Sequence, residues 1–259
     1  MPQDWRNWLT ACPIAHRGLH DQRHGVVENS IAAADRAIAS GFAIECDVQL
    51  SADGEAVVFH DFELERLTGS AGKLIDLPAK TICAAQFRDG RGHPPRLAEF
   101  LAHIADRAAV IIEIKSDFSG DTRLGERVAG IAARNDARLA IKSFDPAVMA
   151  FLQRNRGQFG LGDTPLGMVA EAEYEHPEWA QLSAELRSSL PNFLHWEATR
   201  PDFLSWNIDD FPHPTPHLLH TALALPVMTW TVRTPDQLER AKQWADQIIF
   251  EETRGLRID

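Results

Sequence analysis

Short apolar runs alternate with amphipathic segments along most of this chain. Apolar runs predict strands at 13–16, 42–50, 55–60, 109–115, 138–143, 158–162, 203–206, 226–231 and 247–250. Helical periodicity predicts helices at 28–40, 96–107, 121–135, 145–155 and 234–244. About eight strands that mostly alternate with helices favour a closed TIM (β/α)8-type barrel over an open doubly wound sheet.

Two stretches interrupt this alternation. Residues 61–95 are rich in Gly, Pro, Asp and Thr and lack a long periodic segment. We interpret them as a small subdomain inserted between early strands of a single barrel domain that spans 1–259. The stretch 163–202 resists assignment because Pro and acidic residues interrupt it. No glycine-rich dinucleotide fingerprint follows the first strand, which argues against a Rossmann domain.

Charged residues interrupt two apolar strands at positions that share a face. Glu45 and Asp47 lie two apart, as do Glu113 and Lys115, and alternate side chains in a strand point the same way. We expect the three carboxylates to face the barrel axis, where they repel one another unless a cation binds. An all-oxygen set favours Mg²⁺ or Ca²⁺ over zinc. The alternative is an ordinary Glu113–Lys115 ion pair at a solvated strand end.

Histidines follow two of the apolar runs. His16 ends the first run and His60 ends the third. Two imidazoles on either side of a metal-bound phosphorus can act as general base and general acid, although a single histidine is more often a packed or surface residue. Arg17 can hold phosphate oxygens in a bidentate fork, and an exposed arginine beside a strand is the alternative.

Other polar and aromatic residues near strand ends are weaker candidates. Trp196, Trp206 and Trp230 either floor a pocket or pack the barrel, and we retain Trp230 as a candidate substrate-binding residue. The polar loop 20–24 either reaches the same mouth or is solvated. Cys46 alternates away from the carboxylates, so we expect a small core residue there.

Composition narrows the classes of partner and location. The 259 residues include 26 Lys and Arg against 37 Asp and Glu, and a net charge of −11 argues against a nucleic-acid partner. Three cysteines match neither a disulfide framework nor a zinc ribbon, which favours a reducing, cytoplasmic location. We expect no transmembrane segment and no secretory signal, because no sufficiently long apolar stretch exists. The oligomeric state is not defined by the sequence.

In combination, these residues resemble the glycerophosphodiester phosphodiesterase family. The motifs that carry the resemblance run in order from about residue 14 to about 250: His16-Arg17-Gly18, Glu28-Asn29-Ser30, Glu45-Cys46-Asp47-Val48, Ser51-Ala52-Asp53-Gly54, Val57-Val58-Phe59-His60-Asp61, Leu67-Thr68, Pro95-Arg96-Leu97, Ile112-Glu113-Ile114-Lys115, Ser143-Phe144 and Trp230-Thr231-Val232. Each motif alone is weakly specific, whereas the ordered series is highly specific.

The resemblance implies a TIM-type barrel with a small insertion and a defined set of site residues. It implies one divalent cation, Mg²⁺ or Ca²⁺, held by Glu45, Asp47 and Glu113. It also implies that His16 and His60 form the acid–base pair.

The resemblance further implies that Arg17 and Lys115 bind the phosphate. The implied reaction is hydrolysis of a small-molecule glycerophosphodiester to glycerol 3-phosphate and an alcohol, through a cyclic phosphate in several members. The chain departs from the family at its end, where Ile249-Phe250-Glu251-Glu252 stands in place of a Thr-Asp-Pro type turn. Glu251 there approaches the metal, approaches the substrate headgroup or is solvated.

Three alternatives stay open at this point. One is a phospholipase D-like lyase on the same barrel that acts on lysolipids or sphingomyelin. Another is a barrel that binds a phosphodiester or a partner without turnover. The third is a metalloenzyme that catalyses enolisation, with Lys115 as its base.

Overall fold

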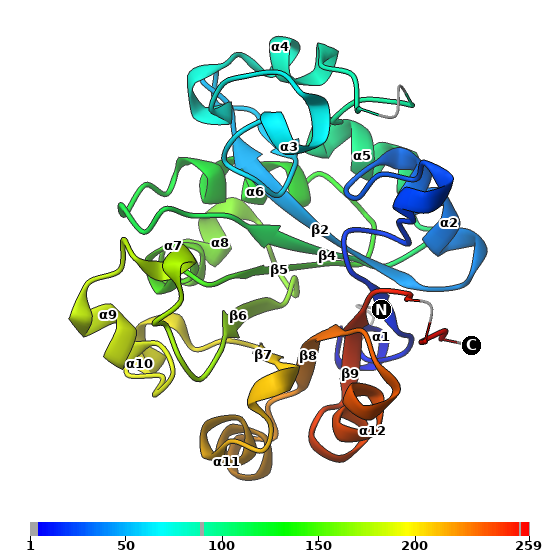
Figure 1. Cartoon of the computed structure of the whole chain (residues 1–259). Coiled ribbons are helices and arrows are strands. Elements are labelled where there is room, and N and C mark those ends of the chain that lie inside the picture. Colours follow the sequence, from blue (N-terminus) through cyan, green and yellow to red (C-terminus); the bar gives the residue numbers. More distant parts are fainter. Residues whose placement is uncertain (1–4, 89–90, 254, 259) are drawn as a thin grey trace.

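Eight parallel strands form a closed barrel in the computed structural model, which describes residues 5–88, 91–253 and 255–258 (Figure 1). Around the barrel, the strands are β1 (Ile14–Ala15), β2 (Ala43–Leu50), β4 (Val110–Ile114), β5 (Leu139–Ser143), β6 (Leu166–Ala170), β7 (Phe203–Asn207), β8 (Val227–Val232) and β9 (Gln247–Phe250). Strand β1 pairs with both β2 and β9, which closes the ring. The predicted TIM-type barrel is confirmed.

Helices surround the strands (Figure 1). They are α1 (Trp5–Leu9), α2 (Ile31–Ala39), α5 (Leu97–Ile104), α6 (Arg123–Ala132), α7 (Pro146–Arg154), α8 (Arg156–Phe159), α9 (Ala184–Ser189), α10 (Trp196–Thr199), α11 (Pro214–Leu223) and α12 (Pro235–Trp244). Single turns of 3-10 helix form η1 (Gln22–His24), η3 (Pro177–Trp179) and η4 (Ile208–Asp210). The side chains of Ser30 and Thr234 cap α2 and α12, so both helices begin where the sequence predicts.

Two apolar layers follow from the alternation of side chains along the strands. Ile44, Cys46 and Val48 point outward into the large cluster between strands and helices, which confirms the prediction for Cys46. Inward-pointing residues fill the barrel near its amino-terminal end, where Leu9 of α1 packs against them. Gly167 makes room for this layer, because a Cβ there would lie 2.3 Å from the ring of Phe203. Nearer the carboxyl ends of β2, β4 and β5, inward positions are charged: Glu45, Asp47, Glu113 and Lys142.

The irregular stretch lies between β3 (Ala56–Val58), which pairs antiparallel with β2, and α5. It contains α3 (Glu65–Thr68), η2 (Leu74–Asp76) and α4 (Ala79–Ala84), which lie beside the end of β2 in Figure 1. Its apolar residues form a cluster separate from the two barrel layers. The domain limits predicted for the insertion and the whole chain stay a prediction, and residues 1–4, 89–90, 254 and 259 lie outside the described residues.

The strand predicted at 158–162 is wrong. Helix α8 ends at Phe159, and Gly160 and Gly162 adopt positive φ values of 70° and 48° in the turn that follows. Glycine takes this conformation without steric cost, so the short apolar run is a turn. The strand in this region is β6, inside the stretch that resisted assignment. No helix among the described residues is long and apolar enough to cross a membrane.

Candidate active site

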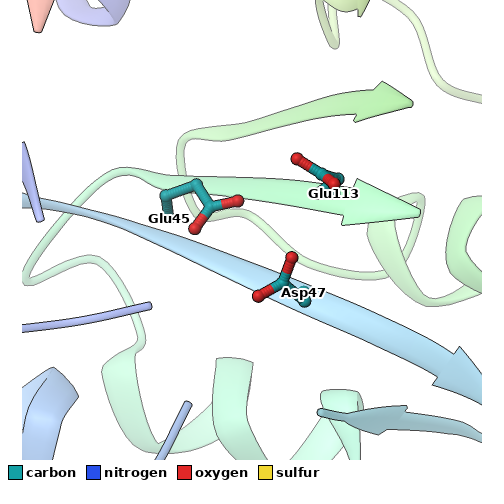
Figure 2. Close-up of side chains that lie close together, drawn as sticks. All are labelled: Glu45, Asp47 and Glu113. Atoms are coloured by element: carbon teal, nitrogen blue, oxygen red, sulfur yellow. The ribbon is translucent and has the colours of Figure 1, made fainter. Parts of the chain in front are cut away.

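Three carboxylates converge inside the barrel from two adjacent strands (Figure 2). Glu45 and Asp47 lie on β2, and Glu113 lies opposite Asp47 on β4. One oxygen of each lies within 4.8 Å of the others, and all three residues are buried. The structure therefore brings together the three residues for which a shared cation was predicted.

Positive side chains surround this carboxylate cluster. Lys115 Nζ lies 2.7 Å from Glu113 and 3.2 Å from Asp47, and Arg17 Nε lies 3.3 Å from Asp47. Burial favours a raised pKa for Glu113, but the ammonium groups of Lys115 and Lys142 outweigh it and lower this pKa to about 2. The predicted Glu113–Lys115 ion pair thus forms inside the cluster, not at a solvated strand end.

Lys142 on β5 is a site residue that the sequence analysis missed. Its Nζ lies 2.7 Å from Glu113 and 3.2 Å from Glu45. The available signal was the same as for Glu113, because Lys142 is a charged residue that interrupts an apolar strand. In the β4–β5 register, it lies directly opposite Glu113.

His16 lies at the end of β1, and a carboxylate holds its ring. Nδ1 is 2.6 Å from Glu251 Oε1, and Nε2 is 3.9 Å from Glu45 Oε2. Arg233 donates two hydrogen bonds to Glu251, at 2.8 and 2.9 Å. Glu251 is therefore neither solvated nor part of the carboxylate cluster, and its described contacts orient His16. Although burial opposes the shift, hydrogen bonds from His16 and Arg233 lower the pKa of Glu251.

His60 is held in the same way by a carboxylate and an arginine. Its Nδ1 lies 2.8 Å from Asp61, and Arg66 of α3 donates hydrogen bonds to both oxygens of Asp61, at 2.5 and 3.0 Å. In both histidines, a carboxylate occupies Nδ1, so Nε2 is the nitrogen left to face a substrate. The inserted segment thus contributes Arg66 to the site.

The motif Glu28-Asn29-Ser30 supports the site as well as beginning α2. Glu28 accepts hydrogen bonds from Arg17 at 2.6 Å and from Arg66 at 2.7 and 3.0 Å. The side-chain amide of Asn29 donates to Asp47 at 2.9 Å and accepts from the Asp47 backbone N–H at 3.1 Å. Arg17 and Asn29 both have a φ of 55°, a strained backbone conformation that is concentrated at functional sites.

The remaining candidates divide between the site and packing. The indole of Trp230 donates to the backbone oxygen of Ser205 at 3.1 Å and meets Phe144 edge-on, with ring centroids 5.5 Å apart. Trp206 is fully buried in the outer apolar cluster, and Trp196 packs against that cluster, so both are packing residues. In the loop 20–24, Asp21 pairs with Arg23 and His24.

An α/β barrel with acidic, basic and imidazole groups at the carboxyl ends of its strands has its polar site where barrel enzymes place their active sites. The sequence matches the model of the Glycerophosphoryl diester phosphodiesterase family over residues 16–251. The chain belongs to this family.

Individual relatives match more limited segments. The chain is 40% identical over 111 residues to a glycerophosphodiester phosphodiesterase of Caldanaerobacter subterraneus subsp. tengcongensis. This match covers 40% of this chain and 44% of the relative. It is 40% identical over 70 residues to glycerophosphodiester phosphodiesterase 1 of Bos taurus, which covers 27% of this chain and 20% of the relative. The matched segments thus span less than half the length of these curated relatives.

Solved structures share the whole barrel. A phosphodiesterase of Oleispira antarctica, in complex with the product sn-glycerol-3-phosphate, has a TM-score of 0.72 at 18% identity, with 93% of this chain and 94% of that chain covered. A glycerophosphodiester phosphodiesterase of Thermotoga maritima has a TM-score of 0.69 at 23% identity, with 92% and 94% covered. At this identity, the likeness shows the shared fold.

Proposed function

We propose that this protein hydrolyses small-molecule glycerophosphodiesters to glycerol 3-phosphate and an alcohol, with one divalent cation as its cofactor. The observation that carries the proposal is a buried carboxylate cluster with two carboxylate-held histidines, His16 and His60, near Asp47. Membership of the family supports it, as does the product bound to the Oleispira antarctica relative of the same fold.

The carboxylate cluster fits a divalent cation. Three buried carboxylates lie within bonding reach of one ion. Glu45 Oε1 is buried and accepts no hydrogen bond from the described residues, although Lys142 Nζ lies 3.2 Å away, so it retains a lone pair for a ligand. Oxygen ligands of this kind suit Mg²⁺ or Ca²⁺. When bound, such a cation withdraws negative charge from the phosphoryl oxygens.

Arg17 and Lys115 are the candidate phosphate-binding residues. Their side chains are 18% and 17% exposed, so each reaches the solvent side of the cluster while its charged end contacts a carboxylate. Both can therefore turn toward a bound diester, and their charges stabilise the charge that develops on phosphorus in the transition state. The partly buried ring of Trp230, which packs against the inner apolar layer, is the candidate apolar wall for the glycerol.

His16 and His60 are suited to the two proton transfers. In the first step, the glycerol 2-hydroxyl oxygen bonds to phosphorus and the bond to the departing alkoxy oxygen breaks. One histidine takes the hydroxyl proton, and the other protonates the departing alcohol. Water then opens the cyclic phosphate to glycerol 3-phosphate, with the two histidines in reversed roles. Holding the 2-hydroxyl in line with the leaving oxygen makes the first step intramolecular.

The test is release of glycerol 3-phosphate from glycerophosphocholine and related diesters by the purified protein with Mg²⁺ or Ca²⁺. We expect EDTA to abolish release, and His16→Ala and His60→Ala each to lower kcat by about 100-fold or more. His24→Ala, a change of an exposed loop histidine, is the control. Diesters left intact with both ions would contradict the proposal and favour a binding barrel, whereas unchanged activity in His16→Ala would contradict the place of His16 in the acid–base pair.

A groove beside Lys115 favours a second candidate, the phospholipase D-like lyase on lysolipids or sphingomyelin. Phe62 and Ile75 of the inserted segment line the groove together with buried leucines. Phe62 is 50% exposed and Ile75 is 43% exposed, so both present apolar surface to the groove. Exposed apolar side chains in a groove beside a site can hold an acyl chain. Assays with lysophosphatidylcholine and with glycerophosphocholine separate the two candidates, because the lyase prefers the lysolipid and releases a cyclic phosphate.

We also propose a cytoplasmic location. Cys12, Cys46 and Cys83 are all free in the structure, as expected of a protein in a reducing compartment. Fractionation of cells that express the chain tests this location, and recovery in a secreted fraction would contradict it.

A further inference from the structure

Lys142 is a buried ammonium group that the proposed mechanism does not use. Its side chain is 2% exposed, and it contacts two of the three carboxylates in the barrel. Gly167 pairs with Lys142 on the neighbouring strand β6, and it has no side chain to lie between Lys142 and the barrel interior. Lys142 Nζ lies 2.7 Å from Glu113 and 3.2 Å from Glu45, so its ion pairs place a positive charge against two of the carboxylates.

Its burial distinguishes Lys142 from the other cations at the cluster. Arg17 and Lys115 are partly exposed and can swing toward a substrate phosphate. Lys142 extends inward from β5, opposite Glu113 and two residues beyond Ala140 of the apolar inner layer. A sealed side chain in a packed interior has few alternative rotamers, so it cannot move away when a second cation enters the cluster.

We propose that Lys142 is a built-in counter-ion of the carboxylate cluster, which holds Glu45 and Glu113 in place in the absence of metal and weakens the binding of a divalent cation. It acts through these carboxylates and is thus a positioning residue. The inference depends on the proposed function in one respect, namely that the carboxylate cluster binds a divalent cation.

Two electrostatic effects follow from this position. Without metal, three buried carboxylates repel one another, and Lys142 offsets that repulsion from inside the barrel. With metal, two positive charges share Glu45 and Glu113, and their mutual repulsion lowers the affinity for the ion. Loss of the ammonium should therefore destabilise the metal-free protein and strengthen metal binding. A lysine that served only to fill space would produce neither change when replaced by an apolar side chain of similar length.

The test compares the Lys142→Met variant with the full-length wild type. Methionine keeps an unbranched chain and removes the charge. The same substitution at Lys242, an exposed residue of α12 paired with Glu239, is the matched control. Titration calorimetry gives the Kd for Mg²⁺, and thermal unfolding gives the midpoint in EDTA and in saturating Mg²⁺.

We expect Lys142→Met to bind Mg²⁺ at least tenfold more tightly than the wild type, which corresponds to about 1.4 kcal/mol. Its midpoint in EDTA should fall, and the rise on adding Mg²⁺ should exceed that of the wild type. Lys242→Met should match the wild type in all three measurements. An equal or weaker affinity for Mg²⁺, or an unchanged midpoint in EDTA, would overturn the inference.

A double variant decides the case if Lys142→Met does not fold in EDTA. Glu113→Gln combined with Lys142→Met removes one charge of each sign, so a counter-ion role predicts a higher yield of folded protein than in the single variant. No recovery would overturn the inference. A wild type that binds neither Mg²⁺ nor Ca²⁺ contradicts the proposed function instead, and stability in EDTA then still decides whether Lys142 is a counter-ion.

Discussion

Both candidate catalytic histidines are supported by a carboxylate that is itself supported by an arginine. His16 contacts Glu251, which pairs with Arg233, and His60 contacts Asp61, which pairs with Arg66. The carboxylate fixes the orientation of each ring, because it occupies Nδ1. The arginine in turn fixes the carboxylate. Each ring can therefore present Nε2 without losing entropy at the moment of reaction.

Glu251 offers a direct test of this support. We expect Glu251→Gln to lower kcat for diester hydrolysis by about 10-fold to 100-fold, because a neutral amide cannot retain both the Arg233 ion pair and the His16 contact. KM and the Kd for Mg²⁺ should change little, since Glu251 is not part of the carboxylate cluster. Glu252→Gln, the same change one residue later, is the control, and a wild-type kcat in Glu251→Gln would refute the role.

Glu28 predicts a pH dependence of stability. Burial opposes ionisation, but Arg66 and Arg17 outweigh it and lower the pKa of Glu28 from 4.5 to about 2. A carboxyl group with a lower pKa in the folded state contributes stability above its unfolded pKa, and this contribution is lost as the pH falls toward 2. The contribution is on the order of 3 kcal/mol at neutral pH.

Unfolding by urea at pH 6 and at pH 3 measures this effect. The free energy of unfolding of the wild type should fall more between these two values than that of Glu28→Gln, which has no carboxyl group to protonate. Equal losses in both proteins would show that Glu28 contributes nothing to the acid sensitivity.

For individual residues, the sequence predicted the positions of side chains on strands better than those of side chains in loops. A two-residue period placed Glu45, Asp47 and Glu113 on the inner face, and it applies equally to Lys142. No local pattern places Glu251 beside His16, because 235 residues separate them. Arg66 likewise reaches Glu28 across 38 residues through the fold of the inserted segment. Long-range contacts between loops depend on the closed barrel, which no short motif encodes.

At the scale of elements, capping residues and apolar periodicity predicted most strands and, among the described residues, all helices of eight or more residues except α11. Strand β6 was missed because Pro and acidic residues interrupt the stretch around it, whereas β4, which is equally buried on both faces, is a near-continuous apolar run. The glycine of β6 adds to the difficulty, since glycine is uncommon in strands. Gly167 is explained only by the partner strand, whose Phe203 ring occupies the space of the missing side chain.

Two glycine-to-alanine substitutions test this explanation. Gly167→Ala should lower the free energy of unfolding by about 1–3 kcal/mol, because the new methyl group would clash with the Phe203 ring on the neighbouring strand. Gly130→Ala, in the last turn of α6 where an added Cβ would meet nothing within 4 Å, should raise it by about 0.5–1 kcal/mol. Urea denaturation of both variants gives the comparison, and equal effects would mean that packing against Phe203 is not the constraint.

In the whole molecule, the two ends of the barrel differ, because one end is filled by apolar residues and the other contains the candidate active site. The amino-terminal end contains an apolar layer that α1 covers, with Trp5, Trp8 and Leu9 packed against the inner residues. The carboxyl end contains the carboxylate cluster, both histidines and the contacts from the inserted segment. This division is typical of α/β barrels, in which loops at one end vary while the other end maintains the fold.

Leu9→Ala is the corresponding prediction for the whole molecule. Leu9 is 1% exposed, so its truncation should lower the free energy of unfolding by about 2–5 kcal/mol. At temperatures where the variant is folded, kcat, KM and the Kd for Mg²⁺ should equal those of the wild type, because the lost contacts lie at the opposite end from the carboxylates. Leu218→Ala on α11, at a leucine that is 60% exposed, should change neither stability nor activity. A fall in kcat or in Mg²⁺ affinity for folded Leu9→Ala would show instead that the two ends of the barrel are energetically coupled.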